Sequence, residues 1–253
     1  MPENLALITG AGRGIGRSIA FRLATAGIPV VLVARSSEEI TALRNEIIYS
    51  GGKAYATPCD ISISAEVNAL KDDILNDLGR VNILVNNAGV APSSKLADTT
   101  DELWRETFAV NIDGAFYVTR AFLPAMIADG GHVISIASTA ALEGFRYTAA
   151  YTASKHALLG FMRALTEEFK STQIKFSTIC PGFTRTQILT KAMIAFADRS
   201  GKSHEEAEAI YAMMNREGRL IEPEEIAETV YRIITTENLS SGLEYHADGV
   251  LIA

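Results

Sequence analysis

Short apolar runs alternate with longer amphipathic segments over most of the chain. Apolar runs bounded by glycine or polar residues are typical of buried strands, and apolar residues at helical spacing are typical of helices that pack on one side. Strands are predicted at 5–9, 29–34, 53–59, 81–85, 132–138, 174–180 and 243–247. Helices are predicted at 15–26, 36–50, 64–78, about 100–128, 149–170 and 223–236.

This alternation predicts the fold class. Apolar strands separated by helices are typical of a parallel sheet covered on both faces, because each connection between parallel strands needs a crossover. We therefore expect one α/β domain over residues 1–253, built on a doubly wound sheet of about seven strands. Ligands of such sheets bind at the carboxyl ends of the strands. The long mixed segment 184–218 fits the alternation poorly, and we interpret it as a substrate lid.

Composition narrows the class of protein. Hydrophobic residues make up 48% of the 253 residues and charged residues 21%, which suits a large core and excludes global disorder. The formal net charge of −7 argues against a nucleic-acid partner. No apolar run is long enough to cross a bilayer, and the first residues carry no secretory signal pattern. The four histidines lack metal-ligand spacing, so no catalytic metal is expected.

The two cysteines, Cys59 and Cys180, both fall in strand-like runs. We interpret them as reduced core residues of a cytoplasmic protein. A catalytic cysteine is the alternative.

A glycine-rich turn lies between the first strand and the first helix. The stretch Thr9 to Gly16 reads TGAGRGIG, with glycines spaced as G-x-x-x-G-x-G and one extra glycine between them. Glycines in this position allow the backbone to approach a pyrophosphate, which then sits on the helix N-terminus. A plain turn is the alternative, but the context favours dinucleotide binding. The expected contacts are Gly10, Gly12, Arg13, Gly14, Ile15 and Gly16.

The end of the second strand indicates which coenzyme binds. NAD sites place an acid there for the ribose 2′-hydroxyl, whereas this chain has Ala34 and Arg35. Arg35 and Arg13 could both pair with a 2′-phosphate, which favours NADP(H) over NAD(H). Asp60, at the end of the third strand, could accept a hydrogen bond from the adenine amine or could simply cap a turn. Ile61 beside it is expected to line the same end of the site.

A second group of polar residues follows the later strands. Asn86 begins the sequence NNAG after the fourth strand, Asn111 lies within the long helical region, and Ser138 ends the fifth strand. Tyr151 and Lys155 are one turn apart on the next helix and therefore share a face. With TGAGRGIG and the Pro181-Gly182 turn, these motifs make the whole chain resemble the classical short-chain dehydrogenase/reductase family, whose fold is of the Rossmann type.

That resemblance implies a role for each matching residue. Tyr151 would be the general acid/base, and Lys155 would bind the nicotinamide ribose and lower the pKa of the tyrosine. Ser138 would hydrogen-bond the substrate oxygen, and Asn111 would hold a water that links Lys155 to solvent. Further coenzyme contacts are implied at Asn86, Ala88, Pro181, Gly182, Thr184 and Thr186.

Elementary chemistry supports the assignment of the tyrosine and the lysine. Hydride transfer to a carbonyl builds negative charge on oxygen, so a proton must be delivered there. A free tyrosine has a pKa of about 10, and a nearby ammonium favours its phenolate form. Ser138 adds a neutral donor for the same oxygen.

The substrate and the assembly are less constrained by the sequence. Apolar pocket walls are expected at Leu142, Phe145, Phe183, Ile188 and Met193. The stretches YTASKHALLGF and CPGFTRT resemble 3-oxoacyl thioester reductases and polyketide ketoreductases, which implies a ketone, a secondary alcohol or an acyl thioester as substrate. The resemblance also implies a homotetramer. Two alternative functions are an NAD-dependent alcohol dehydrogenase on the same fold and a non-catalytic dinucleotide-binding regulator. Arg185 on the lid could meet a carboxylate or a phosphate.

Overall fold

A parallel sheet forms the centre of the molecule. The computed structural model describes residues 4–237 and 239–246. Its strands are β1 (Ala6–Thr9), β2 (Val30–Ala34), β3 (Ala54–Pro58), β4 (Ile83–Asn86), β5 (Gly131–Ile136), β6 (Ile174–Cys180) and β7 (Leu243–His246). They lie in the order β3-β2-β1-β4-β5-β6-β7, and each neighbouring pair is parallel. The predicted doubly wound fold is confirmed.

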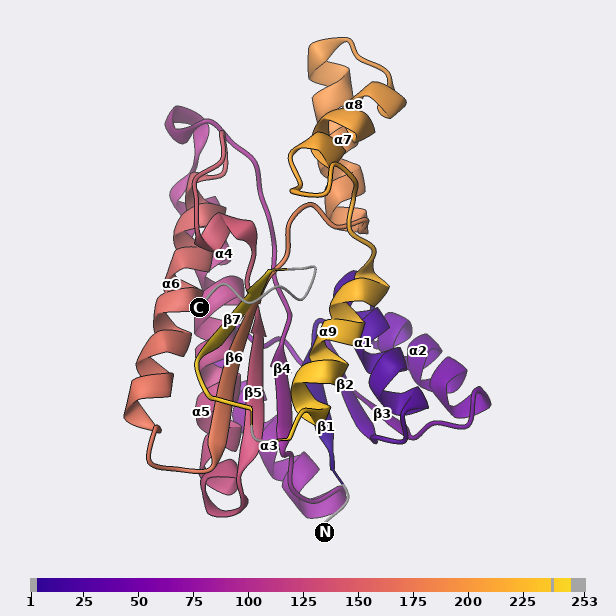
Figure 1. The fold of residues 1–253 in the computed structure, drawn as a ribbon, viewed down its shortest axis with the longest axis vertical. Helices are drawn as coiled ribbons and strands as arrows, with labels where there is room; N and C mark the ends of the chain where they lie inside the picture. The colour runs from indigo at the N-terminus through magenta and orange to yellow at the C-terminus, as the bar shows by residue number, and fades with distance from the viewer. Residues whose placement is uncertain (1–3, 238, 247–253) are drawn as a thin grey trace.

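Helices cover both faces of this sheet (Figure 1). They are α1 (Gly14–Thr25), α2 (Ser37–Tyr49), α3 (Ser64–Asp77), α4 (Asp101–Phe108), α5 (Gly114–Asp129), α6 (Ala149–Glu168), α7 (Gln187–Ser200), α8 (His204–Met213) and α9 (Pro223–Thr235). Apolar residues of α1, α2 and α9 pack in one core cluster, and those of α3, α5 and α6 pack in another. Strand residues alternate between the clusters, with Ala6 and Ile8 in the first and Leu7 in the second.

The strand order reverses between β1 and β4. Chain connections run from β1 outward to β3 on one side and from β4 outward to β7 on the other. Loops at the carboxyl ends of β1 and β4 therefore diverge, which leaves a crevice at this switch point. The glycine turn after β1 and residues 87–89 after β4 both border this crevice.

Three local differences from the sequence-based prediction bear on the site. Strand β5 ends at Ile136, and Ser138 instead caps a short helix (Thr139–Ala141), accepting a hydrogen bond from the Ala140 amide. Strand β3 ends at Pro58, so Asp60 lies in the following loop. The helix predicted over about 100–128 is interrupted between α4 and α5 by a π-helical turn (Ala109–Asp113). Ala247, predicted to end the last strand, lies outside the described residues.

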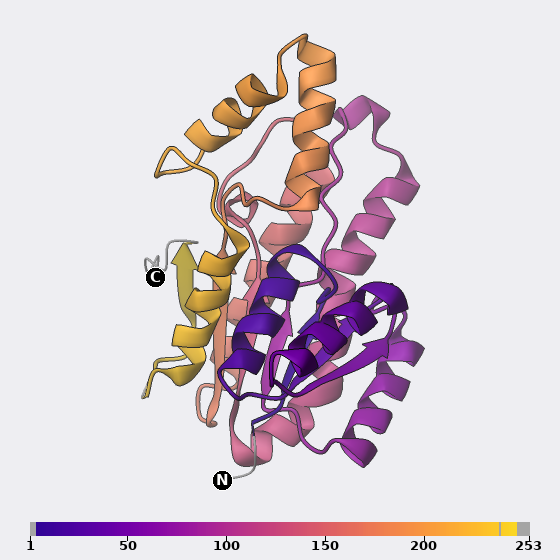
Figure 2. The same ribbon diagram turned by 90° about the vertical axis from the view of Figure 1, so that its right-hand side faces the viewer.

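Helices α7 and α8 project beyond the carboxyl ends of the strands (Figure 2). Both belong to the segment interpreted as a lid. The side chain of Thr186 caps the N-terminus of α7, and Ser203 caps that of α8 in a capping box. These hydrogen bonds determine where the two helices begin. The predicted burial of Cys59 and Cys180 is observed, and both are free thiols. None of the described helices combines the length and apolar character needed to span a bilayer.

Candidate active site

A cavity of about 1020 Å³ opens at the switch point, between the strand ends and the lid. Most residues predicted to bind coenzyme line it: Gly10, Gly12, Arg13, Gly14, Ile15, Arg35, Asp60, Ile61, Ala88, Pro181, Gly182, Thr184 and Thr186. Ser138, Tyr151 and Lys155 line it as well. Gly16, Asn86 and Asn111 are not among its lining residues.

The glycine turn fits a ligand that needs close backbone approach. Gly10 and Gly14 have φ angles of 63° and 52°, a left-handed conformation that strains other residues. A Cβ atom on Gly10 would lie 2.8 Å from the Cα atom of Ala88, and one on Gly16 would overlap the amide of Asn87. Glycine at both positions therefore keeps the floor of the cavity open against the β4 loop, as a pyrophosphate cradle requires.

Asn87 holds this floor in place and was missed in the sequence. Its Nδ2 donates to the carbonyl oxygens of Thr9 at 2.9 Å and Gly10 at 3.2 Å. Asn86, the residue selected from the sequence, points to the opposite side and donates to Thr119 Oγ1 at 2.8 Å. Strand alternation explains the difference, because Asn86 shares its face with Leu84, which packs in the cluster beneath α5.

Charged residues of both signs surround the end of the cavity near β2. Arg13 Nη1 lies 3.6 Å from Glu39 Oε1, and Arg35 Nη1 lies 3.8 Å from Asp60 Oδ2. Asp60 also accepts hydrogen bonds from the amide and hydroxyl of Ser62, at 3.0 and 2.7 Å. Two guanidinium groups at separate walls fit a ligand phosphate, as the sequence predicted for a 2′-phosphate.

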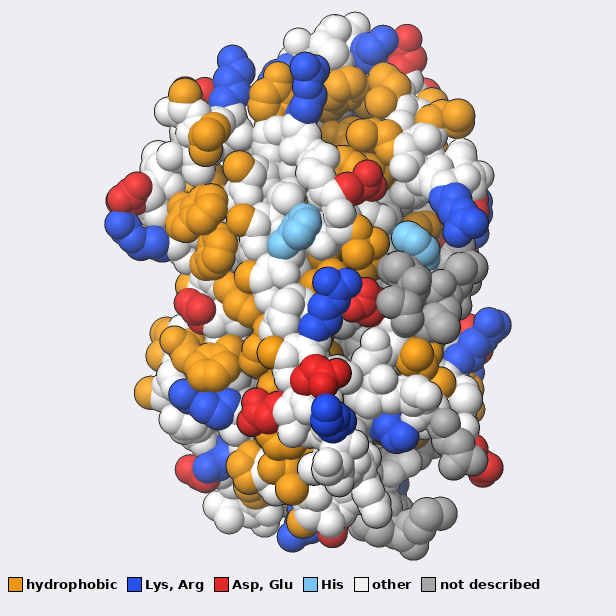
Figure 3. Space-filling model, turned by 60° about the vertical axis from the view of Figure 1, so that its left-hand side comes forward, with side chains coloured by type: hydrophobic (Ala, Val, Ile, Leu, Met, Phe, Trp, Pro, Cys, Tyr) orange, Lys and Arg blue, Asp and Glu red, His pale blue; other side chains and the backbone are white. Residues whose placement is uncertain are grey.

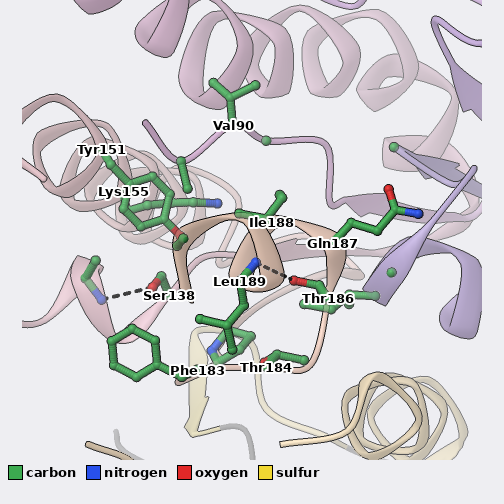
Figure 4. Close-up of a pocket in the computed structure, with 18 of the residues that line it drawn as sticks. Val90, Ser138, Tyr151, Lys155, Phe183, Thr184, Thr186, Gln187, Ile188 and Leu189 are labelled. Carbon is green, nitrogen blue, oxygen red and sulfur yellow. Dashed lines mark hydrogen bonds between the residues drawn. The ribbon is translucent and has the colours of Figure 1, made fainter. Parts of the chain in front are cut away.

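Tyr151 and Lys155 project from α6 toward the strand ends (Figure 4). The Lys155 Nζ atom lies 5.8 Å from the centre of the Tyr151 ring and donates to the carbonyl oxygen of Ile136 at 2.9 Å. Lys155 is only 4% exposed, so its ammonium is shielded from solvent.

Burial shifts the pKa of both groups. Loss of hydration raises the pKa of the Tyr151 phenol, and a hydrogen bond with the Ser138 hydroxyl partly opposes this rise. Loss of hydration also lowers the pKa of Lys155 to about 8. The pKa of the Tyr151 phenol is therefore raised by burial in this structure, whereas the resemblance implied a pKa lowered by Lys155. A protonated phenol beside Ser138 is suited to donating a proton.

Cys180, at the end of β6, lies close to this pair but carries no activated thiolate. Burial is the main reason that its pKa is raised to about 11. The thiol is therefore protonated at neutral pH, and nucleophilic catalysis by Cys180 is disfavoured.

Asn111 occupies the π-helical turn and is almost completely buried. Its Oδ1 accepts from the Val90 amide at 2.8 Å, while Nδ2 donates to the Val90 carbonyl and to Ser154 Oγ, both at 2.9 Å. The side chain therefore ties the loop after β4 to α6, one residue before Lys155. A π-helical turn at such a position is common near functional sites.

The loop after β6 is held by a residue from beyond α8. Asn215 Oδ1 accepts from the Phe183 amide and its Nδ2 donates to the Phe183 carbonyl, both at 2.8 Å. Gly182 is required here, because a Cβ atom would overlap Asn215 Oδ1. Thr184 and Thr186 follow on the cavity wall.

Aromatic rings form the wall between the catalytic residues and the lid. The Phe183 ring centre lies 5.7 Å from that of Phe145 and 5.1 Å from that of Tyr211, and Phe196 lies 5.9 Å from Tyr211. Phe145, Phe183 and Ile188 line the cavity as predicted. Leu142 and Met193 do not, whereas Tyr211 and Phe196 line it and were missed.

Further basic residues line the cavity. Lys95, Arg146 and Arg199 line it, and the only acids among the described lining residues are Glu39 and Asp60 near β2. Arg185, by contrast, pairs with Glu208 and Glu222, each at 2.9 Å, and does not line the cavity. Among the residues with described positions, His, Cys, Asp and Glu form no cluster suited to a metal ion.

Fold and site together define a dinucleotide-dependent oxidoreductase. The family described as short chain dehydrogenase matches residues 4–194, and the chain belongs to it, as the motifs predicted.

Similar proteins include a chain from Streptomyces coelicolor named as a ketoacyl reductase, 36% identical over 92% of this chain and 90% of that relative. An actinorhodin polyketide ketoreductase variant solved with NADPH has a TM-score of 0.92 and 32% identity over 98% of this chain and 97% of its own. A Beutenbergia cavernae protein described as an NAD(P)-dependent gluconate 5-dehydrogenase, solved with NADP, has a TM-score of 0.86 and 31% identity, covering 97% and 95%.

Proposed function

We propose that this protein is an NADP(H)-dependent oxidoreductase that transfers a hydride between nicotinamide and a ketone or secondary alcohol. The observation that carries the proposal is that Ser138, Tyr151 and the buried Lys155 line the same cavity that the glycine turn borders. One cavity thus offers a dinucleotide cradle and a proton donor.

The chain's own residues would divide the reaction as follows. The bound nicotinamide supplies the hydride in reduction and accepts it in oxidation. Tyr151 donates its hydroxyl proton to the oxygen of the reduced carbonyl, and Ser138 donates a hydrogen bond to the same oxygen. In oxidation, Tyr151 removes the proton of the alcohol. The buried ammonium of Lys155 stabilises the phenolate that remains after proton donation.

The coenzyme preference rests on Arg13 and Arg35. Guanidinium groups bind phosphate through paired hydrogen bonds, whereas the hydroxyl of NAD(H) gains little from them. The two similar structures described above contain NADPH or NADP, which supports the same preference. Arg35→Asp is expected to weaken NADPH binding at least tenfold and to leave NADH binding much less affected. Equal weakening of both would argue against the assignment.

Removing the phenol hydroxyl tests the proposed chemistry. Tyr151→Phe is expected to reduce turnover of a ketone and alcohol panel by about a thousandfold or more, while the dissociation constant for NADPH stays within a factor of about three of the wild-type value. Tyr147→Phe is the matched control, since it removes a phenol hydroxyl from the same cavity wall. Unchanged turnover in Tyr151→Phe would refute the role, and a wild-type protein that binds NADPH without turning over any substrate would support a binding regulator.

The basic residues that line the cavity support a 3-oxoacyl thioester of coenzyme A as substrate. Such a substrate carries phosphates far from its reacting carbonyl, and Arg146 and Arg199 line the cavity without an acidic partner among the described residues. Arg199→Ala is expected to raise the KM for a 3-oxoacyl-CoA about fivefold or more and to leave the KM for cyclohexanone unchanged. Lys191→Ala is the control, because this exposed residue of α7 does not line the cavity. Equal effects on both substrates would favour a neutral ketone.

We also propose a cytoplasmic homotetramer. Aromatic side chains on α4 and α5 remain partly exposed, Trp104 at 39% and Phe116 at 37%, and Phe116 meets Phe161 of α6 edge-on. Figure 3 shows hydrophobic side chains gathered in several groups over one side of the molecule. Burial of such groups between subunits is favourable. Light scattering is expected to give four times the chain mass of 27.2 kDa, and a monomer would exclude this assembly.

A further inference from the structure

Glu39 brings a negative charge into the part of the cavity that is otherwise suited to a phosphate. It is one of only two acids among the described lining residues, and its carboxylate faces the guanidinium of Arg13 at 3.6 Å. With Arg35 and Asp60 paired nearby, two positive and two negative side chains meet here. The 2′-phosphate region is therefore neutralised by the chain itself before any coenzyme binds.

The position of Glu39 is set by the start of α2. Ser36 caps this helix and accepts a hydrogen bond from the Glu39 amide, so Glu39 occupies the first turn. Its side chain then lies over the glycine turn, where a Cβ atom on Gly12 would come within 2.7 Å of Oε2. Gly12 thus leaves room for the carboxylate as well as for a ligand.

We propose that Glu39 is the residue that limits discrimination between the two coenzymes, because it competes with the 2′-phosphate for Arg13. This inference rests on the proposed dinucleotide-binding function. A 2′-phosphate placed between the two arginines meets a like charge on Glu39, and its binding requires the Arg13–Glu39 pair to separate. A ribose 2′-hydroxyl carries no charge and can instead donate a hydrogen bond to the same carboxylate. Acidic residues accept such a bond from this hydroxyl in NAD sites.

The simpler interpretation is that Glu39 only ties α1 to α2. Arg17 and Glu46 form such a pair farther along the same two helices. Glu39 differs because both it and its partner line the cavity, whereas Arg17 and Glu46 do not. A tie between helices would change stability and leave coenzyme preference unaltered. Coenzyme preference is therefore the property that separates the two interpretations.

Glu39→Gln tests the proposal, because it removes the charge and keeps the shape of the side chain. Glu38→Gln is the matched control: Glu38 is the preceding residue in the first turn of α2, is exposed and does not line the cavity. Both variants remove one negative charge from the helix N-terminus, so the effect of the helix dipole on stability cancels between them. Dissociation constants for NADPH and NADH are measured directly by quenching of protein fluorescence, without turnover.

Glu39→Gln is expected to tighten NADPH binding about tenfold and to leave NADH binding unchanged or weakened by up to about fivefold. The tightening should shrink as salt is raised, because a charge repulsion between partly exposed groups is screened. Glu38→Gln is expected to change both constants by less than a factor of about two. In the Arg13→Ala background the gain from Glu39→Gln should fall below about threefold, because the shared partner is gone.

Unchanged or weaker NADPH binding in Glu39→Gln would overturn the proposal, as would equal tightening for both coenzymes. A loss of thermal stability with unaltered dissociation constants would support the helix tie instead. Failure of the proposed catalytic function would appear differently, as absent turnover in a wild-type protein whose coenzyme constants still respond to Glu39→Gln.

Discussion

Lys155 donates a hydrogen bond from Nζ to the carbonyl oxygen of Ile136 over 2.9 Å. Ile136 is the last residue of β5 and lies two positions before Ser138, so the ammonium is fixed to the sheet edge that also carries the serine. The buried site favours the neutral amine, and this lowers the pKa of Lys155 to about 8. The protein therefore keeps a costly charge at the place where a phenolate would form.

Replacing Lys155 should stabilise the protein while it destroys activity. The pKa of Lys155 falls from an ordinary 10.5 to about 8. Burying the charged lysine therefore lowers the free energy of unfolding by about 3 kcal/mol. Lys155→Met is expected to raise the free energy of unfolding by a smaller amount, about 1–2 kcal/mol at pH 7, because the Ile136 carbonyl loses its donor. Urea unfolding without coenzyme measures this.

The pH dependence of the same measurement provides the control. Between pH 8 and 10.5 the unfolded chain holds a proton on Lys155 that the folded chain has released, so wild-type stability gains a contribution as pH rises through this window. Lys155→Met should lack that contribution, and the two stability curves should converge toward pH 10.5. A variant less stable than wild type at pH 7 would contradict the buried-charge account.

Asn111 should matter to both stability and catalysis. Asn111→Ala removes three hydrogen bonds and leaves the amide and carbonyl of Val90 without their partners in a partly buried setting. We expect a loss of about 2–4 kcal/mol in the free energy of unfolding. The rate constant kcat should fall more than coenzyme affinity, because the loop after β4 loses its tie to α6. Asn45→Ala is the control, because Asn45 is exposed on the surface of α2, and equal effects of the two changes would argue against this role.

Gly16 should tolerate no side chain, although it lies inside α1. Alanine in a helix interior normally adds up to about 1 kcal/mol of stability over glycine. Here a Cβ atom would overlap Asn87 Nδ2 and the Gly10 carbonyl, which the same amide binds. Gly16→Ala is therefore expected to lower stability by about 2 kcal/mol or more and to weaken NADPH and NADH binding by equal factors. Gly144→Ala, with open space around it, is the control. Wild-type binding in Gly16→Ala would contradict the proposed cradle.

The sequence was sufficient to predict the parallel sheet and the order of its elements. Local signals were enough for this prediction. Apolar runs such as 30–34 indicate strands that are buried on both faces. Gly10 and Gly14 indicate a turn, because they have backbone angles that other residues rarely adopt. The spacing of Tyr151 and Lys155 fixed their common face in the same way. Their upward and downward pKa shifts did not follow from spacing, since both arise from burial, which depends on the complete fold.

Residues that act through long-range packing escaped the sequence analysis. Asn215 holds the Phe183 backbone from 32 positions away, and no local pattern marks it. Tyr211 and Phe196 meet only when α8 folds against α7. Asn87 was missed for a different reason: a strand places neighbouring residues on opposite faces, and the NNAG motif does not say which asparagine faces the cavity. Leu84, two positions before Asn86, is an apolar residue of the same strand face. That spacing could have shown that Asn86 faces the core and Asn87 the cavity.

His132 should make the fold sensitive to mild acid. It lies on β5 with 8% exposure, and its Nε2 pairs with Ser177 Oγ on β6 at 2.9 Å. Burial, with a smaller contribution from Lys175, lowers its pKa to about 4, whereas the unfolded chain binds the proton near 6.5. Stability from this residue is therefore complete above pH 6.5 and is lost as pH falls toward 4.

Between pH 7.5 and 5 the wild-type protein is expected to lose about 2 kcal/mol through His132 alone. His132→Asn can still pair with Ser177 but does not titrate, so its free energy of unfolding should fall by correspondingly less over the same interval. His156→Asn is the control for removing a histidine, because His156 is exposed on the surface of α6, and it should keep the wild-type slope. Urea unfolding at the two pH values measures all three proteins. Parallel losses in wild type and His132→Asn would show that other groups set the acid sensitivity, whereas a flatter slope in His132→Asn alone would assign it to the buried β5–β6 pair.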